Sequence, residues 1–506
     1  MNCEHGKCTG SAILALAVFL CLIGRGQAQQ AGAGPDSVSG EAAPARIEQR
    51  MDQLVAALDS MRRQLDQSQR EMEQLRSELQ ELRAQLPPQT GGEEAAQSAA
   101  SLQASVRQLQ EQGEILQSEV KQHDQSKVES LSKYPVRLSG MVLFTSLLNS
   151  GNVDSIDLPI VALPRQAGEP AGSLSATPRQ TILGLDATGP PLWGAHSSAS
   201  VSMDFFGGIP YADYTTSSGI LRLRVAHAGL TWANRSLAVV FDKPLISPLQ
   251  PASYLSVGEP ALAWSGNLWT WSPQLQFKNN AGTGGKMPGL EFGLIDAAAP
   301  GSPANNGLRQ PSTSERSHQP GYEGRLSYSL PFGDHPVEVG AGGYYSRQTF
   351  QYGQHADAWA GTADWSVPFS HTLEFSGELY RGRGIGGLGG GAFKDYVTYS
   401  HYRVLHGLNA EGGWAQFKIR MPASLEANLA IGQDNAFAGQ LRTSDLASGP
   451  TDYTNLARNR TAFGNVIFRP KTYLLFSAEF RNIDSSPIAG KGNSNHSLGF
   501  ASAYLF

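Results

Sequence analysis

Apolar residues follow two different spacings along this chain. Between residues 46 and 86 they recur at alternating intervals of four and three, whereas from residue 134 to residue 506 they recur at every second position. The first spacing is that of a heptad repeat, and the second is that of β-strands with one apolar and one polar face. The pattern therefore predicts an α-helical coiled coil followed by an all-β domain.

The heptad segment, residues 46–86, contains no glycine or proline, and only Ser68 interrupts its apolar seam. Pro87 and Pro88 end it, because proline disfavours the helical conformation in the residue before it. A weaker repeat follows at residues 102–132. A narrow stripe of this length favours self-association, with a single amphipathic helix lying on its own domain as the alternative. The predicted coiled-coil core positions are Ile47, Met51, Leu54, Leu58, Met61, Leu65, Met72, Leu75, Leu79 and Leu82.

Strand-like alternation recurs through residues 134–506, for example in LRLRV, AQFKIRM and LLFSAEFR. The connections range from the three residues 422–424 to long stretches such as 300–321 and 382–392. Short turns at one rim and long loops at the other are typical of outer-membrane barrels, and we expect antiparallel strands. A soluble β-sandwich would show the same alternation, so this pattern alone does not separate the two.

The first 28 residues have the organisation of a secretory signal peptide, with an apolar run at 11–24 and small residues before the expected cleavage point. All three cysteines, Cys3, Cys8 and Cys21, lie in this leader, so the mature chain has no thiol to form a disulfide. No later apolar run approaches the ~18 residues of a membrane helix. An exported chain of this kind, ending on the strand-like SLGFASAYLF, favours a transmembrane barrel whose last strand pairs with its first.

The sequence thus predicts six segments. They are a signal peptide (1–28), a polar linker (29–45), a coiled coil (46–86), a break containing proline and glycine (87–101), a second, weaker helical segment (102–132) and an outer-membrane β-barrel (134–506).

Charge differs between these parts. Residues 29–133 carry 11 Lys and Arg against 17 Asp and Glu, whereas residues 134–506 carry 26 of each. No basic patch of the kind that binds nucleic acid is present. A barrel with no net charge favours only modest ion selectivity.

The order of the predicted segments, with a signal peptide, a heptad repeat, a barrel and a terminal aromatic residue, resembles that of the DcaP-like trimeric outer-membrane porins with a periplasmic coiled coil. Phosphate-selective porins are a related comparison. The more specific stretches are RQTILGLDATG (179–189), SASVSMDFFGG (198–208), LRLRVAHAGLTW (221–232) and EPALAWSGNLWTWSPQLQF (259–277), which we interpret as early strands and the connection after the third or fourth strand.

The resemblance implies about 16 strands, a homotrimer in the Gram-negative outer membrane, a coiled coil in the periplasm and passage of small anionic solutes. The sequence leaves 18 strands open as the alternative. It also implies that Phe500, Tyr504 and Phe506 form the signal that the barrel-assembly machinery recognises. It assigns no individual constriction arginine.

If apolar residues face lipid, the alternate positions face the lumen, where charged side chains set selectivity. LRLRV and FKIRM each place two cations on one face, about 7 Å apart, and two such cations can hold a carboxylate or phosphate. The alternative is that these cations pair with lumen carboxylates and only stiffen the wall. The candidate pore-lining residues are Arg222, Arg224, Lys278, Arg325, Lys418, Arg420, Arg481, Glu291, Glu374, Glu378 and Glu426, with Glu338 and Glu479 on the same faces.

Two other motifs suggest different chemistry. GIGGLG (384–389) has the glycine spacing of a dinucleotide-binding loop, but the residues after it are strand-like, so we expect a flexible surface loop. NSNHSLG (493–499) is faintly similar to outer-membrane phospholipases, but His496 and Ser497, as neighbours in a strand, would point to opposite faces. No histidine spacing indicates a metal site, and the sequence predicts no enzyme activity and no cofactor.

The sequence therefore predicts a homotrimeric outer-membrane porin for passive diffusion of small hydrophilic solutes, with a weak preference for anions such as dicarboxylates or phosphate-like ions. Two alternatives remain: an envelope protein whose barrel anchors a coiled-coil rod of ~60 Å, and an outer-membrane esterase or phospholipase. The expected partners are other copies of the chain, outer-membrane lipid, the barrel-assembly machinery and, through the coiled coil, the cell wall.

Overall fold

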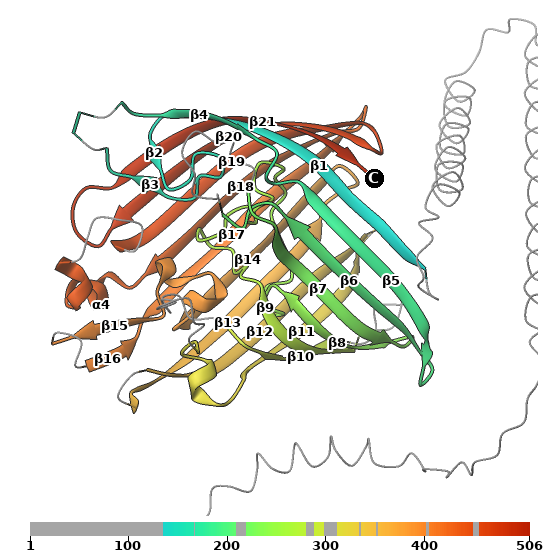
Figure 1. The fold of residues 1–506 in the computed structure, drawn as a ribbon, viewed down its shortest axis with the longest axis horizontal. Helices are drawn as coiled ribbons and strands as arrows, with labels where there is room; N and C mark the ends of the chain where they lie inside the picture. The colour runs from blue at the N-terminus through green and yellow to red at the C-terminus, as the bar shows by residue number, and fades with distance from the viewer. Residues whose placement is uncertain are drawn as a thin grey trace, which may run out of the picture. The chain divides into compact units, whose positions relative to one another are not determined.

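A closed antiparallel sheet makes up most of the described part of the chain (Figure 1). The computed structural model describes residues 135–165, 167–168, 170–208, 219–279, 288–297, 311–332, 335–350, 353–400, 404–448 and 455–506. The predicted signal peptide, linker, coiled coil, break and second helical segment, with every predicted coiled-coil core position, lie outside these residues.

The main sheet contains 17 strands. They are β1 (Val136–Asn149), β4 (Ser173–Thr177), β5 (Ile182–Leu192), β6 (Ala195–Asp204), β7 (Arg222–Thr231), β8 (Arg235–Asp242), β9 (Ser272–Asn279), β10 (Gly289–Ile295), β11 (Gly321–Phe332), β12 (His335–Thr349), β13 (His355–Pro368), β14 (Leu373–Arg383), β17 (Asn409–Met421), β18 (Leu425–Ala436), β19 (Leu456–Lys471), β20 (Leu474–Pro487) and β21 (Asn493–Leu505).

Strands β4 and β5 form a single crossing of the barrel wall. Both pair antiparallel with β1, which places Thr177 opposite Thr145 and Ile182 opposite Met141. The crossing is interrupted at residues 178–181, where Pro178 has no N–H to donate to the ladder. The 17 strands of the sheet therefore make 16 barrel strands, as predicted, and the 18-strand alternative is wrong.

The barrel closes between its first and last strands. Met141 of β1 lies opposite Leu505 of β21, and the pairing continues to Asn149 opposite Ser497. Beyond β21, the N–H of Phe506 donates to the carbonyl oxygen of Gly140 at 3.1 Å, and the N–H of Gly140 donates back at 2.9 Å. This confirms the predicted pairing of the first and last strands of the barrel, which leaves no open edge between them.

The two rims differ in the length of their connections (Figure 1). The rim that holds the chain's C-terminus has turns such as 422–424 and 472–473, whereas the other rim has connections 150–172, 243–271 and 384–408. The short elements lie on the second rim: β2 (Asn152–Val153), β3 (Ala162–Leu163), η2 (Glu315–Ser317), η4 (Gly386–Leu388), η5 (Gly391–Phe393), β15 (Tyr396–Tyr399), β16 (Val404–Gly407), α4 (Ala438–Arg442) and η6 (Asp445–Ser448). None of the helices described here is long and apolar enough to span a bilayer.

The polarity of the wall is the inverse of that of a soluble protein. Its outer face exposes large apolar side chains, with Phe144 57%, Leu429 58% and Phe500 57% exposed, whereas charged Glu323 and Arg325 are 2% and 4% exposed on the inner face. A soluble domain buries its apolar residues and solvates its charges. The barrel therefore has an apolar exterior suited to lipid and a polar interior, as the alternation predicted, and the sandwich alternative is wrong.

Candidate pore constriction

The connection between β8 and β9, residues 243–271 and here called the inner loop, folds into the barrel. One part of it, Ile246, lies in an apolar cluster with Tyr344 and Tyr380 of the wall. Another part, Leu255, lies in a cluster with Leu143 and Leu147 of β1. The inner loop follows the fifth barrel strand, so the expectation that it follows the third or fourth is wrong.

Wall side chains hold the inner loop by accepting hydrogen bonds from its backbone. Side chains that face inward from several strands replace the ladder partners that an irregular segment lacks, because a buried N–H needs an acceptor. The contacts, in order along the inner loop, are Leu245 N–H to Glu323 Oε2 (2.9 Å), Leu249 N–H to Glu378 Oε1 (2.7 Å), Ala252 N–H to Gln416 Oε1 (2.7 Å), and Val257 and Gly258 N–H to Gln180 Oε1 (2.8 Å each).

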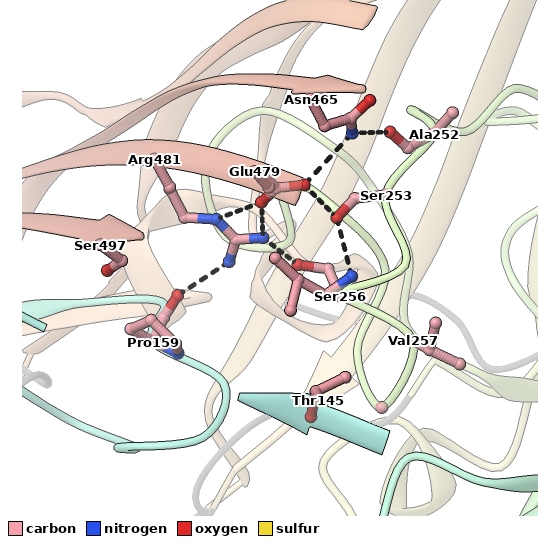
Figure 2. A network of polar contacts seen from close by, with 12 residues as sticks. Thr145, Pro159, Ala252, Ser253, Ser256, Val257, Asn465, Glu479, Arg481 and Ser497 are labelled. Atoms are coloured by element: carbon pink, nitrogen blue, oxygen red, sulfur yellow. Dashed lines mark hydrogen bonds and ion pairs between the residues drawn. The ribbon is translucent and has the colours of Figure 1, made fainter. Parts of the chain in front are cut away.

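A second set of contacts centres on Glu479 and Arg481 of β20 (Figure 2). Arg481 Nη2 donates to Glu479 Oε1 at 2.6 Å and to Ser256 Oγ of the inner loop at 2.5 Å, while its Nη1 donates to the carbonyl oxygen of Pro159 at 3.2 Å. Ser253 Oγ donates to Glu479 Oε2 at 2.5 Å. Both charged side chains are therefore occupied in fastening the inner loop and the 150–172 connection to the wall.

Residues 384–395, here called the glycine-rich loop, pack against the inner loop. The Trp269 N–H donates to the carbonyl oxygen of Leu388 at 3.0 Å, and Phe393 stacks on Trp264 with ring centroids 4.2 Å apart. Gly389 has a φ of +100°, and a Cβ there would lie 2.8 Å from the Trp269 ring. The expectation of a flexible surface loop is therefore wrong, because these glycines permit close packing. The three-residue 3₁₀ helix η5 and then strand β15 follow the glycines. A dinucleotide-binding loop opens a long helix, so the dinucleotide interpretation fails, as predicted.

Three arginines alternate with two aromatic rings inside the barrel. The Arg179 guanidinium lies 4.4 Å from the Phe206 ring centre, and that of Arg222 lies 5.6 Å from the same ring. Arg222 and Arg224 lie 5.0 Å and 5.2 Å from the Trp271 ring centre. We call this arrangement the arginine–aromatic stack, since each ring lies within cation–π range of two guanidinium groups.

Two aspartates partly neutralise this stack. Arg179 pairs with Asp157 at 2.5 Å, whereas Asp204 is shared between Arg222 at 2.8 Å and Arg224 at 3.6 Å. Arg222 also donates to the carbonyl oxygen of Gly258 in the inner loop. Arg224 therefore has the weakest carboxylate contact of the three, and its Nη1 has no hydrogen-bond partner.

Arg224 borders a cavity of about 400 Å³ between the inner loop and the wall. Lys418 of β17 and Arg469 of β19 also line the cavity, and Glu426 of β18 is its one carboxylate among the described residues. Arg469 donates to the Tyr254 hydroxyl at 2.8 Å. Among the described residues, no carboxylate pairs with Lys418 or Arg469. Three cations against one carboxylate give this cavity a net positive charge.

The cations predicted from the neighbouring strands are instead neutralised. Arg325 contacts Asp364 at 2.6 Å, Glu291 at 2.8 Å and Glu338 at 3.1 Å, and Lys278 contacts Glu291 at 3.2 Å. We call these five residues the Arg325 cluster. Near the short-turn rim, Arg420 pairs with Glu374 at 2.5 Å. For these residues the structure agrees with the alternative prediction, in which lumen cations pair with lumen carboxylates.

Sequence reasoning missed several residues that organise the site. Glu323 and Gln416 lie two positions before Arg325 and Lys418, so the alternation could have placed them on the inner faces. Arg179 and Gln180 lie in the break between β4 and β5, where no periodicity exists to indicate their direction. Among the predicted residues, the structure brings Arg224, Lys418 and Glu426 together, and assigns Glu378 to holding the inner loop.

The residues near the C-terminus face the directions predicted for them. Phe500 and Tyr504 are 57% and 52% exposed on the outer face. His496 stacks on Phe480, itself 54% exposed, whereas Ser497 is buried and donates to Asn149 Oδ1 at 2.8 Å. A histidine and a serine on opposite faces cannot act as base and nucleophile, so this geometry contradicts the esterase alternative.

No protein-family model and no curated protein matches this chain. Among solved structures, the outer-membrane channel DcaP of Acinetobacter baumannii is similar at 17% identity and a TM-score of 0.57, over 74% of this chain and 99% of that one. The anion-selective porin from Comamonas acidovorans matches at 12% identity and a TM-score of 0.46, over 74% of this chain and 100% of that one. OprB of Pseudomonas putida matches at 12% identity and a TM-score of 0.45, over 73% of this chain and 94% of that one. The similarity to DcaP shows a shared 16-stranded barrel fold.

Proposed function

We propose that this chain is an outer-membrane porin through which small hydrophilic solutes diffuse passively, with a preference for small anions such as dicarboxylates or phosphate-like ions. The observation that carries the proposal is the cavity beside the inner loop, which Arg224, Lys418 and Arg469 line against the single carboxylate of Glu426. The apolar exterior and the charged interior support placement in a bilayer.

The mechanism needs no chemical step. A polar lumen removes most of the cost of dehydrating a solute in the bilayer, and the inner loop narrows the path. The cations that line the cavity outnumber its carboxylate, so they raise the local concentration of anions. Arg224 and Lys418 are anchored on strands of the wall, so they hold their positions while an anion passes, and the shared Asp204 keeps the attraction weak enough for release.

We also propose that three copies assemble in the outer membrane, with residues 46–86 as a coiled coil in the periplasm. The heptad spacing supports this assembly. Phe500, Tyr504 and Phe506 are proposed as the barrel-assembly signal because they end the strand that closes the wall.

The test of anion preference is the reversal potential of the purified full chain in planar bilayers under a KCl gradient. Arg224→Glu combined with Lys418→Glu reverses the cavity charge, so we expect the channel to change from anion-preferring to cation-preferring. Arg347→Glu is the matched control, because Arg347 is an exposed cation on the outer side of β12. An unchanged reversal potential in the double variant would show that the cavity does not lie on the ion path.

A further inference from the structure

Glu426 of β18 is the one carboxylate among the described residues that line the cavity beside the inner loop. The register of the sheet places three cations next to it. Arg420 of β17 lies directly opposite Glu426. Lys418 of β17 and Arg469 of β19 lie two residues along from the positions opposite it, at the diagonal spacing of about 7–8 Å.

None of these three cations forms an ion pair with Glu426 in the part of the chain that the structure describes. Arg420 pairs with Glu374 at 2.5 Å instead. Glu426 accepts a hydrogen bond at Oε1 from Asn428 Nδ2, at 2.9 Å. A neutral group therefore orients this side chain, and its negative charge is available to a solute in the cavity.

Arg224 lines the same cavity from the other side. In the strand order of the sheet, its strand β7 is across the barrel from β17 and β18. Its Nη1 has no hydrogen-bond partner among the described residues, and Asp204 at 3.6 Å offsets part of its charge. The cavity thus presents a carboxylate flanked by cations on one wall and a partly neutralised cation on the facing wall.

We infer that the cavity selects acidic amino acids, which carry one ammonium and two carboxylates, over dicarboxylates of the same chain length. The inference rests on the proposed function and names the solute class within it. The ammonium contacts Glu426, the adjacent carboxylate contacts Lys418 or Arg469, and the second carboxylate reaches toward Arg224. Each charged group of the solute then meets a side chain of opposite sign, whereas a dicarboxylate leaves Glu426 facing a like charge.

Two simpler roles for Glu426 fit the contacts less well. A site for anions alone gains nothing from this residue, because a carboxylate among the cations weakens the attraction for phosphate or a dicarboxylate. A carboxylate that only neutralised the wall would pair with one of the flanking cations, as Glu374 does with Arg420. An ammonium group in the solute turns the same carboxylate into an attractive contact.

The experiment measures uptake of radiolabelled L-glutamate and of glutarate into lipid vesicles that contain the purified full chain. The two probes share a carbon skeleton and both carboxylates, and only L-glutamate carries an ammonium group. The wild-type chain should take up L-glutamate faster than glutarate. Glu426→Gln removes the charge and keeps the shape. We expect it to lower the ratio of L-glutamate to glutarate uptake about fivefold, the effect of one pair of unit charges about 4 Å apart in water.

Glu338→Gln is the matched control. Glu338 is also a lumen carboxylate, with its side chain 48% exposed, but it belongs to the Arg325 cluster and lies outside the cavity lining. Both variants remove one negative charge from the lumen, so an effect of net charge alone would change the uptake ratio equally in both. We expect the wild-type ratio in Glu338→Gln. An equal fall in the two variants, or an unchanged ratio in Glu426→Gln, would overturn the inference.

The reversal potential under a KCl gradient separates this inference from the proposed function. A wild-type channel that prefers anions but takes up glutarate as fast as L-glutamate overturns the amino-acid inference and leaves the proposed function standing. A wild-type chain that forms no conducting channel, or one that prefers cations, overturns the proposed function itself. Conductance in KCl also shows that each variant has folded and inserted, so a changed uptake ratio reports on selection between the two solutes.

Discussion

Two groups of charges inside this barrel contain similar residues and behave differently. In the Arg325 cluster, two cations meet three carboxylates, and Arg325 is 4% exposed. At the cavity beside the inner loop, three cations meet one carboxylate, and the cavity is open enough to hold a small solute. In both groups the charged residues alternate with apolar residues along the strands, so the sequence pattern is the same. The presence of charged residues that face the lumen therefore does not by itself identify a selectivity site.

The difference arises from where the inner loop lies. In the Arg325 cluster, wall side chains from neighbouring strands face one another directly and pair across 2.6 to 3.2 Å. At the cavity, residues of the inner loop line the space beside the wall cations, and elsewhere the inner-loop backbone donates hydrogen bonds to the carboxylates of Glu378 and Glu323. The inner loop thus removes carboxylates that could otherwise neutralise the pore.

The largest effect we expect is on stability, from Arg325→Met. This change leaves Asp364, Glu291 and Glu338 without their shared partner, and breaking a buried ion pair by removing one member costs about 3–5 kcal/mol. The free energy of unfolding, measured by urea titration of the barrel folded into vesicles, should fall by about that amount. Arg347→Gln removes an exposed pair with Asp357 and should change it little. Equal losses in the two variants would mean that the Arg325 cluster is not structural.

Removal of one cation at the cavity should change selectivity by a smaller amount. Lys418→Gln deletes a unit charge, which at about 10 Å in water is worth about 0.4 kcal/mol, or about a twofold decrease in the anion-to-cation permeability ratio. Lys278→Gln is the comparison variant, because Lys278 is held by Glu291 in the Arg325 cluster. We expect Lys278→Gln to shift the reversal potential less than Lys418→Gln does. A larger shift in Lys278→Gln would place the selectivity site at the Arg325 cluster instead of the cavity.

A third effect should depend on pH. Glu259 lies in the inner loop, and burial, together with nearby Asp154, raises its pKa to about 7, against the opposing influence of Arg222. Below that pKa the carboxyl is neutral, and above it the carboxylate is negative, so the anion-to-cation permeability ratio should fall as pH rises from 6 to 8. The change should be less than about twofold, because Arg222 compensates part of the charge. Glu259→Gln should abolish it, and a pH dependence that persists in that variant would point to another group.

The fold could be predicted from the sequence because its main determinants are local. Alternation in segments such as AQFKIRM identifies a strand and its two faces without knowledge of its neighbours. The pairing of charges could not be predicted, since it depends on contacts between distant residues: Arg325 meets Asp364 39 residues away, and Leu249 meets Glu378 129 residues away. The path of the inner loop into the barrel could not be predicted for the same reason. Its hydrogen-bond acceptors lie in five parts of the wall that are far apart in the sequence: Gln180, Glu323, Glu378, Gln416 and Glu479.

The smallest effect we expect concerns Arg469, the most exposed cation at the cavity. Its charge is already close to water and is oriented by the Tyr254 hydroxyl, so salt should screen it more than Arg224 or Lys418. Arg469→Gln should lower the anion-to-cation permeability ratio by less than about 1.5-fold at 0.1 M KCl, where the Debye length is about 10 Å, and should have no measurable effect at 1 M, where it is about 3 Å. Lys418→Gln should keep part of its effect at 1 M, because a cation beside the permeating ion is screened less than one at the edge of the cavity. If both variants lose their effect together as salt increases, the cavity cations act as a diffuse field, and no individual side chain in the cavity contacts the anion.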